Sequence, residues 1–245
     1  MSSQNQLNDA SLQAPAAAFH SDTAVSAEEI RAALGDNAPL PLQGLLASAR
    51  RSTYVPQSVI YHQGSRSDTI HFVTHGLLKL ITHLPNGRAR IIRLHRPGSV
   101  IGLSGLLGQR NDHMAVAVSQ VSTLRLPLGA LQRMRSEDPA SYVWLVECWH
   151  EYLQEADTWI THFSTGPIRG RVARLLTFLS DFEPEPEKDQ VQLLTCEEMS
   201  SILGVTSESV SRILAEFKRK HILDHKDGAQ SEIYNTDTDR LHHIA

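Results

Sequence analysis

The stretch TCEEMSSILGVTSESVSRILAEFKRKHIL, residues 195–223, predicts two short amphipathic helices joined by a glycine turn. At the start of the first helix, Thr195 can accept a hydrogen bond from the Glu198 N–H while the Glu198 carboxylate accepts one from the Thr195 N–H. Gly204 favours a chain reversal because glycine tolerates positive φ, and Thr206 is a second N-cap. This spacing indicates a helix-turn-helix motif.

The second helix of this motif separates apolar from polar residues. Its buried face is predicted from the spacing i, i+3, i+4, i+7 of Val210, Ile213, Leu214 and Phe217. The opposite face carries Ser207, Glu208, Ser211 and Arg212 on the first two turns, the part that enters the major groove in this motif.

The chemistry of these outward residues suits base edges. Arg212 can donate two hydrogen bonds to O6 and N7 of a guanine, and Glu208 can accept one from the N4 amino group of a cytosine. The alternative is an ordinary i, i+4 ion pair between the two on a solvated helix. We expect the base-reading residues to be Glu208, Ser211 and Arg212, and the phosphate contacts to come from Thr206, Ser207, Arg169 and Lys218.

Length and charge limit the other possibilities. A chain of 245 residues with 41% apolar content can build two modest globular domains. A formal net charge of −4 argues against a protein that coats nucleic acid indiscriminately, so DNA affinity must come from local basic clusters at 169–174 and 218–220. The acidic segment DFEPEPEKD at 181–189 is expected to be an exposed loop.

The sequence also lacks several signals. It has no run of about eighteen apolar residues and no signal-peptide pattern, so we expect a cytoplasmic protein without a membrane partner. Cys148 and Cys196 are too few for a disulfide framework, a four-cysteine zinc site or an iron–sulfur cluster, which we exclude. We found no nucleophile elbow, phosphate-binding glycine loop or HExxH helix, and we expect no catalytic residues, no metal site and no enzyme activity.

The N-terminal half is predicted to contain a disordered arm, then helices and then strands. Residues 1–24 are predicted to be a disordered arm, and SAEEIRAAL and PLQGLLASARR within 26–51 to be packing helices. Residues 52–128 alternate in the manner of five short antiparallel strands, and PNG at 85–87 is the clearest hairpin. The turns are expected at Gly64, Gly76, Gly87, Gly98 and Gly102. A barrel-like or jelly-roll sandwich results, whose interior holds either a small ligand or only a packed core.

After Pro139 the pattern is that of one long helix, from about Asp138 to Phe163. A seam with alternating spacings of three and four is formed by Tyr142, Leu145, Trp149, Tyr152, Ala156, Trp159 and Phe163. We expect this seam to face a second copy of the chain, and Val146, Leu153 and Ile160 to pack against the chain's own β domain. The alternative is a core helix with no partner.

The order of these parts resembles the CRP/FNR superfamily of bacterial transcription regulators over about residues 40–245, with GPIRGRVARLLTFL and VTSESVSRIL as specific matches. The resemblance implies an α+β fold: a β-roll effector domain with flanking helices at 25–137, a dimerisation helix at 138–165 and a winged helix-turn-helix at 166–245, with ILDHKDGAQSEIYN as the wing. It also implies a homodimer with double-stranded DNA and RNA polymerase as partners.

The resemblance also implies a DNA site. The FNR branch carries Glu, two further residues and then Ser-Arg in the recognition helix, and Glu208, Ser211 and Arg212 fill these positions. This match implies half-sites like TTGAT, arranged as an inverted repeat. The single G·C pair of TTGAT agrees with the chemistry of Arg212 and Glu208.

The sequence departs from the family at the residues that would bind a signal molecule. Members that bind cyclic AMP carry Gly-Glu and then Arg-Ser or Arg-Thr, where this sequence has Gly102-Leu103 and His113-Met114. Leu103 and Met114 supply neither an acceptor for the ribose hydroxyl nor a cation for the phosphate, so cyclic AMP is not expected. The iron–sulfur cysteines are missing too. Haem, a small acid or no ligand at all remain open, and no histidine is singled out as a haem ligand.

Cys196 offers another form of control. It would lie in the first turn of the leading helix, where the helix dipole favours a thiolate. Oxidation of this thiol would then disturb DNA docking. The preferred interpretation is a small residue at a helix start, because Glu197 and Glu198 oppose a thiolate.

Overall fold

The computed structural model describes residues 19–21, 25–35, 39–47, 49–85, 87–181, 189–226 and 233–245. They form two compact units, the first within residues 1–78 and 97–133 and the second comprising 79–96 and 134–245. The fold is α+β, as expected.

The β-roll is built from two antiparallel sheets, ordered β1-β2-β9-β4-β7 and β3-β8-β5-β6. The strands are β1 (Phe19–Ser21), β2 (Arg50–Tyr54), β3 (Val59–Tyr61), β4 (Thr69–His75), β5 (Leu78–His83), β6 (Ala89–His95), β7 (Val100–Ile101), β8 (Met114–Ala117) and β9 (Val121–Pro127). Eight described strands lie between residues 50 and 127, so the expected five was too few. Strands as short as β7 show too little alternation to be recognised in the sequence.

The five-stranded sheet presents two different faces. Ile70 and Phe72 of β4 are fully buried, and α1 contacts this strand. The residue between them, His71, points to the other face, because side chains alternate along a strand. The second face is polar, with buried Ser52 and Thr123 beside His71. The apolar core of the first unit therefore lies on one side of this sheet and a polar interior on the other.

The glycine turns are confirmed. All five predicted glycines have positive φ, between 76° and 89°. At Gly76 a Cβ atom would lie 2.0 Å from the backbone oxygen of Gln120, so no other residue fits there without moving the backbone. The hairpin between β5 and β6 is closed by a hydrogen bond from the Leu84 N–H to the Arg88 carbonyl. Asn86 in its tip lies outside the described residues.

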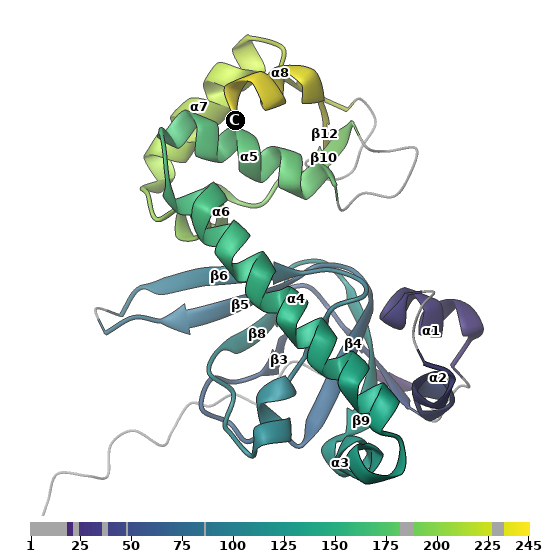
Figure 1. Ribbon diagram of the computed structural model, residues 1–245. Helices are drawn as coiled ribbons and strands as arrows, with labels where there is room; N and C mark the ends of the chain where they lie inside the picture. The colour runs from purple at the N-terminus through teal and green to yellow at the C-terminus, as the bar shows by residue number, and fades with distance from the viewer. Residues whose placement is uncertain are drawn as a thin grey trace, which may run out of the picture. The chain divides into compact units, whose positions relative to one another are not determined.

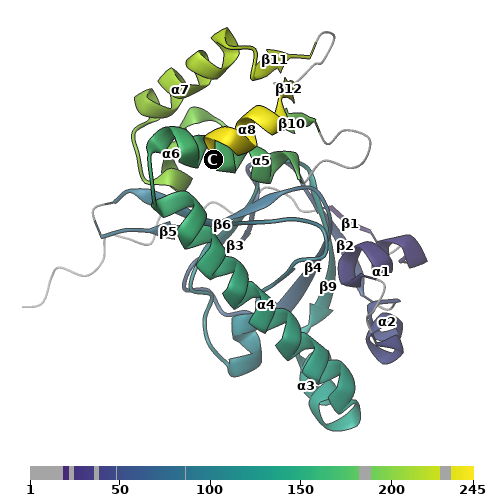
Figure 2. The same cartoon turned by 45° about the horizontal axis from the view of Figure 1, so that its top comes forward.

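The N-terminal segment differs from expectation at two places. Residues 19–21 form β1, which pairs with β2, so the predicted disordered arm over 1–24 is wrong there, and its remaining residues lie outside the described part of the chain. Helix α1 (Ala27–Leu34) begins with a Ser26 capping box. Helix α2 (Leu40–Ala47) ends earlier than predicted, because Arg50 and Arg51 pair with β9. Figures 1 and 2 show α1 and α2 side by side.

A 3-10 turn, η1 (Leu103–Leu107), follows β7, and α3 (Leu128–Glu137) leads into α4 (Pro139–Ser164). The 26 residues of α4 make it about 39 Å long. Its start is as predicted, with Asp138 as the N-cap. It is the longest helix drawn in Figure 1.

Within the chain, the two apolar faces of α4 are buried and exposed in the opposite way to that expected. Leu145 and Phe163, assigned to the partner, are buried within the chain, at 2% and 1% exposure. From the same seam, Tyr152 packs edge-on against His95, and Trp159 against Phe163 and Phe178. The stripe assigned to the chain's own β domain is instead open, with Val146, Leu153 and Ile160 at least half exposed. Aromatic rings bury the most apolar area, so they pack into the chain's own core.

The C-terminal part of the second unit contains four helices and a small sheet among the described residues. They are α5 (Ile168–Ser180), β10 (Gln190–Gln192), α6 (Cys196–Leu203), α7 (Ser207–Arg219), β11 (Leu223–His225), β12 (Ile233–Thr236) and α8 (Thr238–Ile244). The sheet order is β10-β12-β11. Strands β11 and β12 form the predicted wing. Residues 227–232 of the wing and 182–188 of the acidic segment lie outside the described residues. No described helix is long and apolar enough to cross a membrane.

Two histidines are buried in a neutral state. Burial lowers the pKa of His95 to about 3, with Arg93 adding to the shift, and burial likewise lowers the pKa of His71 to about 3, with Arg125 contributing. In the unfolded chain each would take up a proton below about pH 6.5. The unfolded state therefore binds more protons than the folded state between these values, and stability falls as the pH drops below about 6.5.

We predict that His95→Phe makes the free energy of unfolding less dependent on pH between about pH 6.5 and pH 4.5. Phenylalanine has no proton to bind in the unfolded state and keeps a ring against Tyr152. Urea unfolding at a series of pH values measures the slope. The control is His242→Gln, at an exposed position of α8, which should leave the slope unchanged. An identical slope in His95→Phe and the wild-type protein would contradict the prediction.

Candidate nucleic-acid interface

The helix-turn-helix begins as predicted. Thr195 Oγ1 accepts from the Glu198 N–H at 3.2 Å, and the Glu198 carboxylate accepts from the Thr195 N–H at 3.0 Å. These two bonds satisfy donors that the first turn of α6 leaves without helical partners.

Glu198 also makes a contact that the sequence did not predict. Lys79 Nζ lies 2.6 Å from Glu198 Oε1, and both side chains are largely buried. Burial by itself raises the pKa of Glu198, but hydrogen bonds from Lys79 and Thr195 outweigh it and hold the pKa below its usual 4.5. A largely buried pair of this kind is costly to break from one side. The cap of α6 is thereby tied to strand β5, which carries Lys79.

Strand β6 provides a second attachment for α6. Ser201 Oγ accepts from the Ile91 N–H at 2.9 Å and donates to the Ala89 carbonyl at 3.2 Å. These bonds occupy backbone groups at the beginning of β6. Together with Lys79, they connect the β5–β6 hairpin to the first helix of the motif.

The turn between α6 and α7 is fixed by Gly204, whose φ of 65° is left-handed and whose N–H donates to the Ser200 carbonyl. Arg171 Nη1 donates to the Leu203 carbonyl at 2.8 Å, so it caps the end of α6. The neighbouring Arg174 donates to the carbonyls of His162 and Thr165, each at 2.8 Å. Two of the three arginines in the basic cluster at 169–174 are therefore used to hold helix ends.

Helix α7 buries the face that was predicted. Val210, Leu214 and Phe217 are buried, and Ile213 is partly buried. Thr206 is the N-cap and accepts from the Ser209 N–H at 3.3 Å. Figure 2 shows α6, the turn and α7 beside α5 and α8.

The outward face of α7 is open where base contacts were expected. Glu208, Ser211 and Arg212 are exposed, and Ser207 is partly exposed. Within the described residues, Glu208 and Arg212 form no ion pair with each other; the pKa of Glu208 is lowered by hydrogen bonds from its own backbone and from Thr206. The Arg212 guanidinium faces solvent, and this arrangement can present one cationic and one anionic hydrogen-bonding group to a groove.

The expected phosphate contacts are partly engaged within the chain. Arg169 lies 3.4 Å from Glu216 and 5.8 Å from the centre of the Phe217 ring. Lys218 donates to the Tyr234 hydroxyl of β12 at 2.7 Å and stacks over its ring at 4.3 Å. Tyr234 was missed in the sequence because nothing local relates it to α7.

Cys196 occupies the first position of α6 and is partly exposed, while Cys148 lies in α4. Burial, followed by Glu151 and Glu147, raises the pKa of Cys148 to about 11, so this thiol resists ionisation. No group of three His, Cys, Asp or Glu in the described parts of the chain is placed to hold a metal.

Comparison with known proteins agrees with this architecture. Residues 51–138 match the cyclic nucleotide-binding domain family and residues 170–244 the Crp-like helix-turn-helix domain family. The transcriptional regulator LdrP of Thermus thermophilus is 25% identical over 173 residues, 69% of this chain and 85% of that protein. The nitrogen fixation regulation protein FixK of Rhizobium meliloti is 24% identical over 201 residues, 80% of this chain and 86% of that protein.

Among solved structures, FixK2 from Bradyrhizobium japonicum has a TM-score of 0.70 at 22% identity, covering 80% of this chain and 96% of that one. LdrP and FixK are regulators by name, and the likeness to FixK2 shows a shared fold over the part of the chain that it covers. Two family models thus match in succession along the chain, the cyclic nucleotide-binding domain and then the Crp-like helix-turn-helix domain, in the order expected from the resemblance to the CRP/FNR superfamily.

Proposed function

We propose that the protein is a homodimeric, sequence-specific transcription regulator that binds an inverted repeat of TTGAT-like half-sites. The observation that carries this proposal is the exposed face of α7, on which Glu208, Ser211 and Arg212 project from a helix whose other face is buried. In a helix-turn-helix this face is the one that enters the major groove.

Base reading would rest on Arg212 and Glu208. A guanidinium donates to O6 and N7 of guanine, and a carboxylate accepts from the cytosine amino group. Among the described residues, Arg212 and Glu208 form no ion pair with each other, so both side chains are available to a G·C pair. Ser211, between them on the helix surface, can adapt as donor or acceptor.

Backbone contacts would set the register on the duplex. Thr206 and Ser207 stand at the N-terminus of α7, where free N–H groups and the helix dipole favour a phosphate. Arg169 and Lys218 flank the helix. Phosphate pairing with Arg169 has to compete with the Glu216 carboxylate, whereas Lys218 donates to a hydroxyl, that of Tyr234.

The second copy would pack on the open stripe of α4. Val143, Val146, Leu153 and Ile160 are between 50% and 60% exposed. With His150 and Asp157 they give the spacing 3, 4, 3, 4, 3, which is the seam of a coiled coil. Apolar residues at this spacing along one helix suit a parallel two-fold pair, the symmetry that an inverted repeat requires. This stripe replaces the interface expected from the sequence.

We predict that Arg212→Ala weakens binding by about 1 to 3 kcal/mol per half-site and removes the preference for the G·C pair. Fluorescence anisotropy with a TTGAT inverted repeat, beside a duplex with each G·C pair changed, measures both effects. Arg219→Ala, exposed at the end of α7, is the control and should keep the preference. Unchanged discrimination by Arg212→Ala would refute the assignment.

We predict that Leu153→Glu converts the dimer into a monomer, because a carboxylate at the seam would be buried against its symmetry mate. Light scattering after size exclusion gives the mass, and circular dichroism checks that the helices remain. Thr158→Glu, exposed on the same helix outside the seam, should stay dimeric. A dimeric Leu153→Glu protein would place the interface elsewhere.

A redox switch at Cys196 stays a prediction. It requires that hydrogen peroxide weakens DNA binding by the wild-type protein and by Cys148→Ser, but not by Cys196→Ser. The Cys148 thiol is the matched control, because its raised pKa keeps it protonated at neutral pH. Anisotropy on the same duplex measures the effect, and sensitivity that survives Cys196→Ser would exclude the switch.

A further inference from the structure

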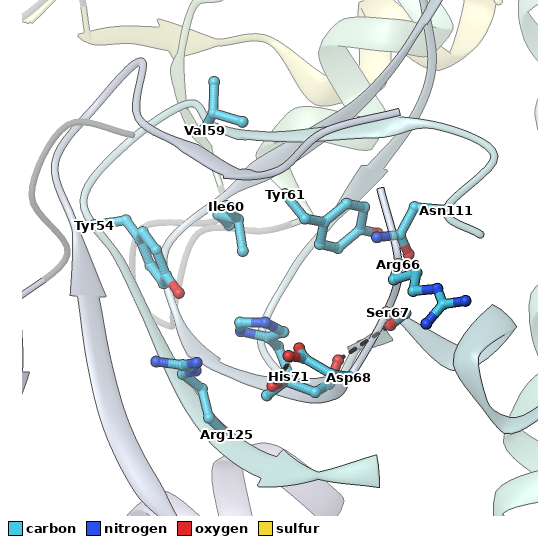
Figure 3. Close-up of a pocket in the computed structure, with 11 residues that line it drawn as sticks. Tyr54, Val59, Ile60, Tyr61, Arg66, Ser67, Asp68, His71, Asn111 and Arg125 are labelled. Atoms are coloured by element: carbon cyan, nitrogen blue, oxygen red, sulfur yellow. Dashed lines mark hydrogen bonds between the residues drawn. The ribbon is translucent and has the colours of Figure 1, made fainter. Parts of the chain in front are cut away.

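A cavity of about 230 Å³ opens on the polar face of the five-stranded sheet, inside the first unit. Its walls come from β2, β4 and β9 of this sheet, from β3, and from the segment before β4. Figure 3 shows Tyr54, His71 and Arg125 at one end of the cavity, and Tyr61 with Asn111 at the other.

The buried lining is aromatic and hydrogen-bonding. The rings of Tyr54 and Tyr61 lie 6.3 Å and 6.4 Å from the ring of His71, measured between centroids. His71 Nδ1 is 3.3 Å from the Thr123 hydroxyl. Burial raises the pKa of both tyrosines, so their hydroxyls are protonated and can donate. Such rings offer an apolar surface with polar groups at its edge.

The charge of the lining is positive. It contains the guanidinium groups of Arg66 and Arg125 and one carboxylate, that of Asp68. His71 adds no charge near neutral pH, because burial holds its pKa at about 3. Arg66 and Asp68 are exposed to solvent, so Arg125, which is only partly exposed, is the cation that the interior of the cavity presents. A bound molecule with a single negative charge would balance it.

Arg125 is the group best suited to receive that charge. It lies on the polar face of β9, only partly exposed, and its guanidinium points toward Tyr54 and His71 in Figure 3. A guanidinium has five N–H donors in a planar fork that matches a carboxylate, so Arg125 can bind a ligand while keeping contacts within the chain.

The cavity does not include the two positions at which the sequence departs from the cyclic AMP-binding members of the family. Leu103 and Met114 are not among its lining residues. Its volume is below the roughly 300 to 1,000 Å³ of sites for drug-sized ligands and corresponds to a ligand of roughly ten non-hydrogen atoms. A cyclic nucleotide is larger than this.

We propose that this cavity binds a small organic acid with one negative charge, its carboxylate on Arg125 and its apolar body between Tyr54 and Tyr61. This site is additional to DNA reading and does not depend on it. Val59 and Ile60, which complete the wall, favour an aromatic or short aliphatic body over a sugar.

The wall of the cavity is also in contact with the turn before η1. Ser67 Oγ donates to the Gly102 carbonyl at 2.9 Å, and a Cβ atom at Gly102 would lie 2.8 Å from the Thr69 carbonyl oxygen. Packing this close transmits displacements, because neither backbone can move without the other. A ligand that shifts residues 66–69 would therefore move the turn at Gly102.

The test uses benzoate as the probe, with benzamide as the neutral molecule of the same shape and inorganic phosphate as an anion without an apolar body. Isothermal titration of the full-length protein should give a dissociation constant of about 1 mM or tighter for benzoate. Benzamide and phosphate should bind at least about tenfold more weakly, because each lacks one of the two features recognised.

The variant is Arg125→Gln, with Arg135→Gln on α3 as the matched control, since Arg135 is an exposed arginine outside the cavity. Benzoate affinity should fall at least about tenfold in Arg125→Gln and stay unchanged in the control. Circular dichroism shows whether each variant is folded. Should Arg125→Gln fail to fold, Arg125→Lys, which keeps the charge but loses the planar fork, should weaken benzoate binding measurably.

Three results would overturn the proposal. They are no benzoate binding at about 10 mM, equal binding of benzamide, and unchanged affinity in a folded Arg125 variant. Failure of DNA binding with intact benzoate binding would leave this site standing and refute the proposed function instead. The two proposals are therefore separable in one set of proteins.

Discussion

The packing of the apolar face of α7 determines which of its side chains the second unit presents to solvent. Val210 and Phe217 are fully buried, so the helix has one rotation about its axis that satisfies its core. That rotation leaves Glu208 and Arg212 in solvent on the first two turns. The left-handed turn at Gly204 then sets the direction from which α7 leaves α6.

Polar contacts add to the hydrophobic core in holding this motif in place. The cap residue Glu198 is bonded to Lys79, and Ser201 is bonded to the backbone of β6. Arg171 closes the other end of α6 on Leu203. Helix ends expose backbone groups that need partners; here the capping box of Thr195 and Glu198 supplies them at the start of α6, and Arg171 of α5 supplies one at its end. A displacement of the β5–β6 hairpin would therefore act directly on α6.

In the β-roll, side chains that alternate along each strand separate an apolar core from a polar interior. One face of β4 places Ile70 and Phe72 in the apolar core, and the other places His71 in a polar cavity. A polar interior costs stability unless its groups are paired, and the Thr123 hydroxyl lies within hydrogen-bonding distance of His71. A polar lining of this kind suits the binding of the proposed small ligand.

The sequence by itself determined the local features of this protein. The capping box at Thr195, the turn at Gly204 and the buried stripe of α7 depend on residues at most seven positions apart, and all three are as predicted. The glycine turns of the β-roll follow the same rule. Tertiary structure decided the rest. Which seam of α4 faces inward depended on Phe178 and His95, which are distant in sequence. The Lys79–Glu198 contact and the cavity at Arg125 each bring together elements that are distant in the sequence. No local pattern encodes which elements meet, because side-chain packing selects among many arrangements with the same periodicity.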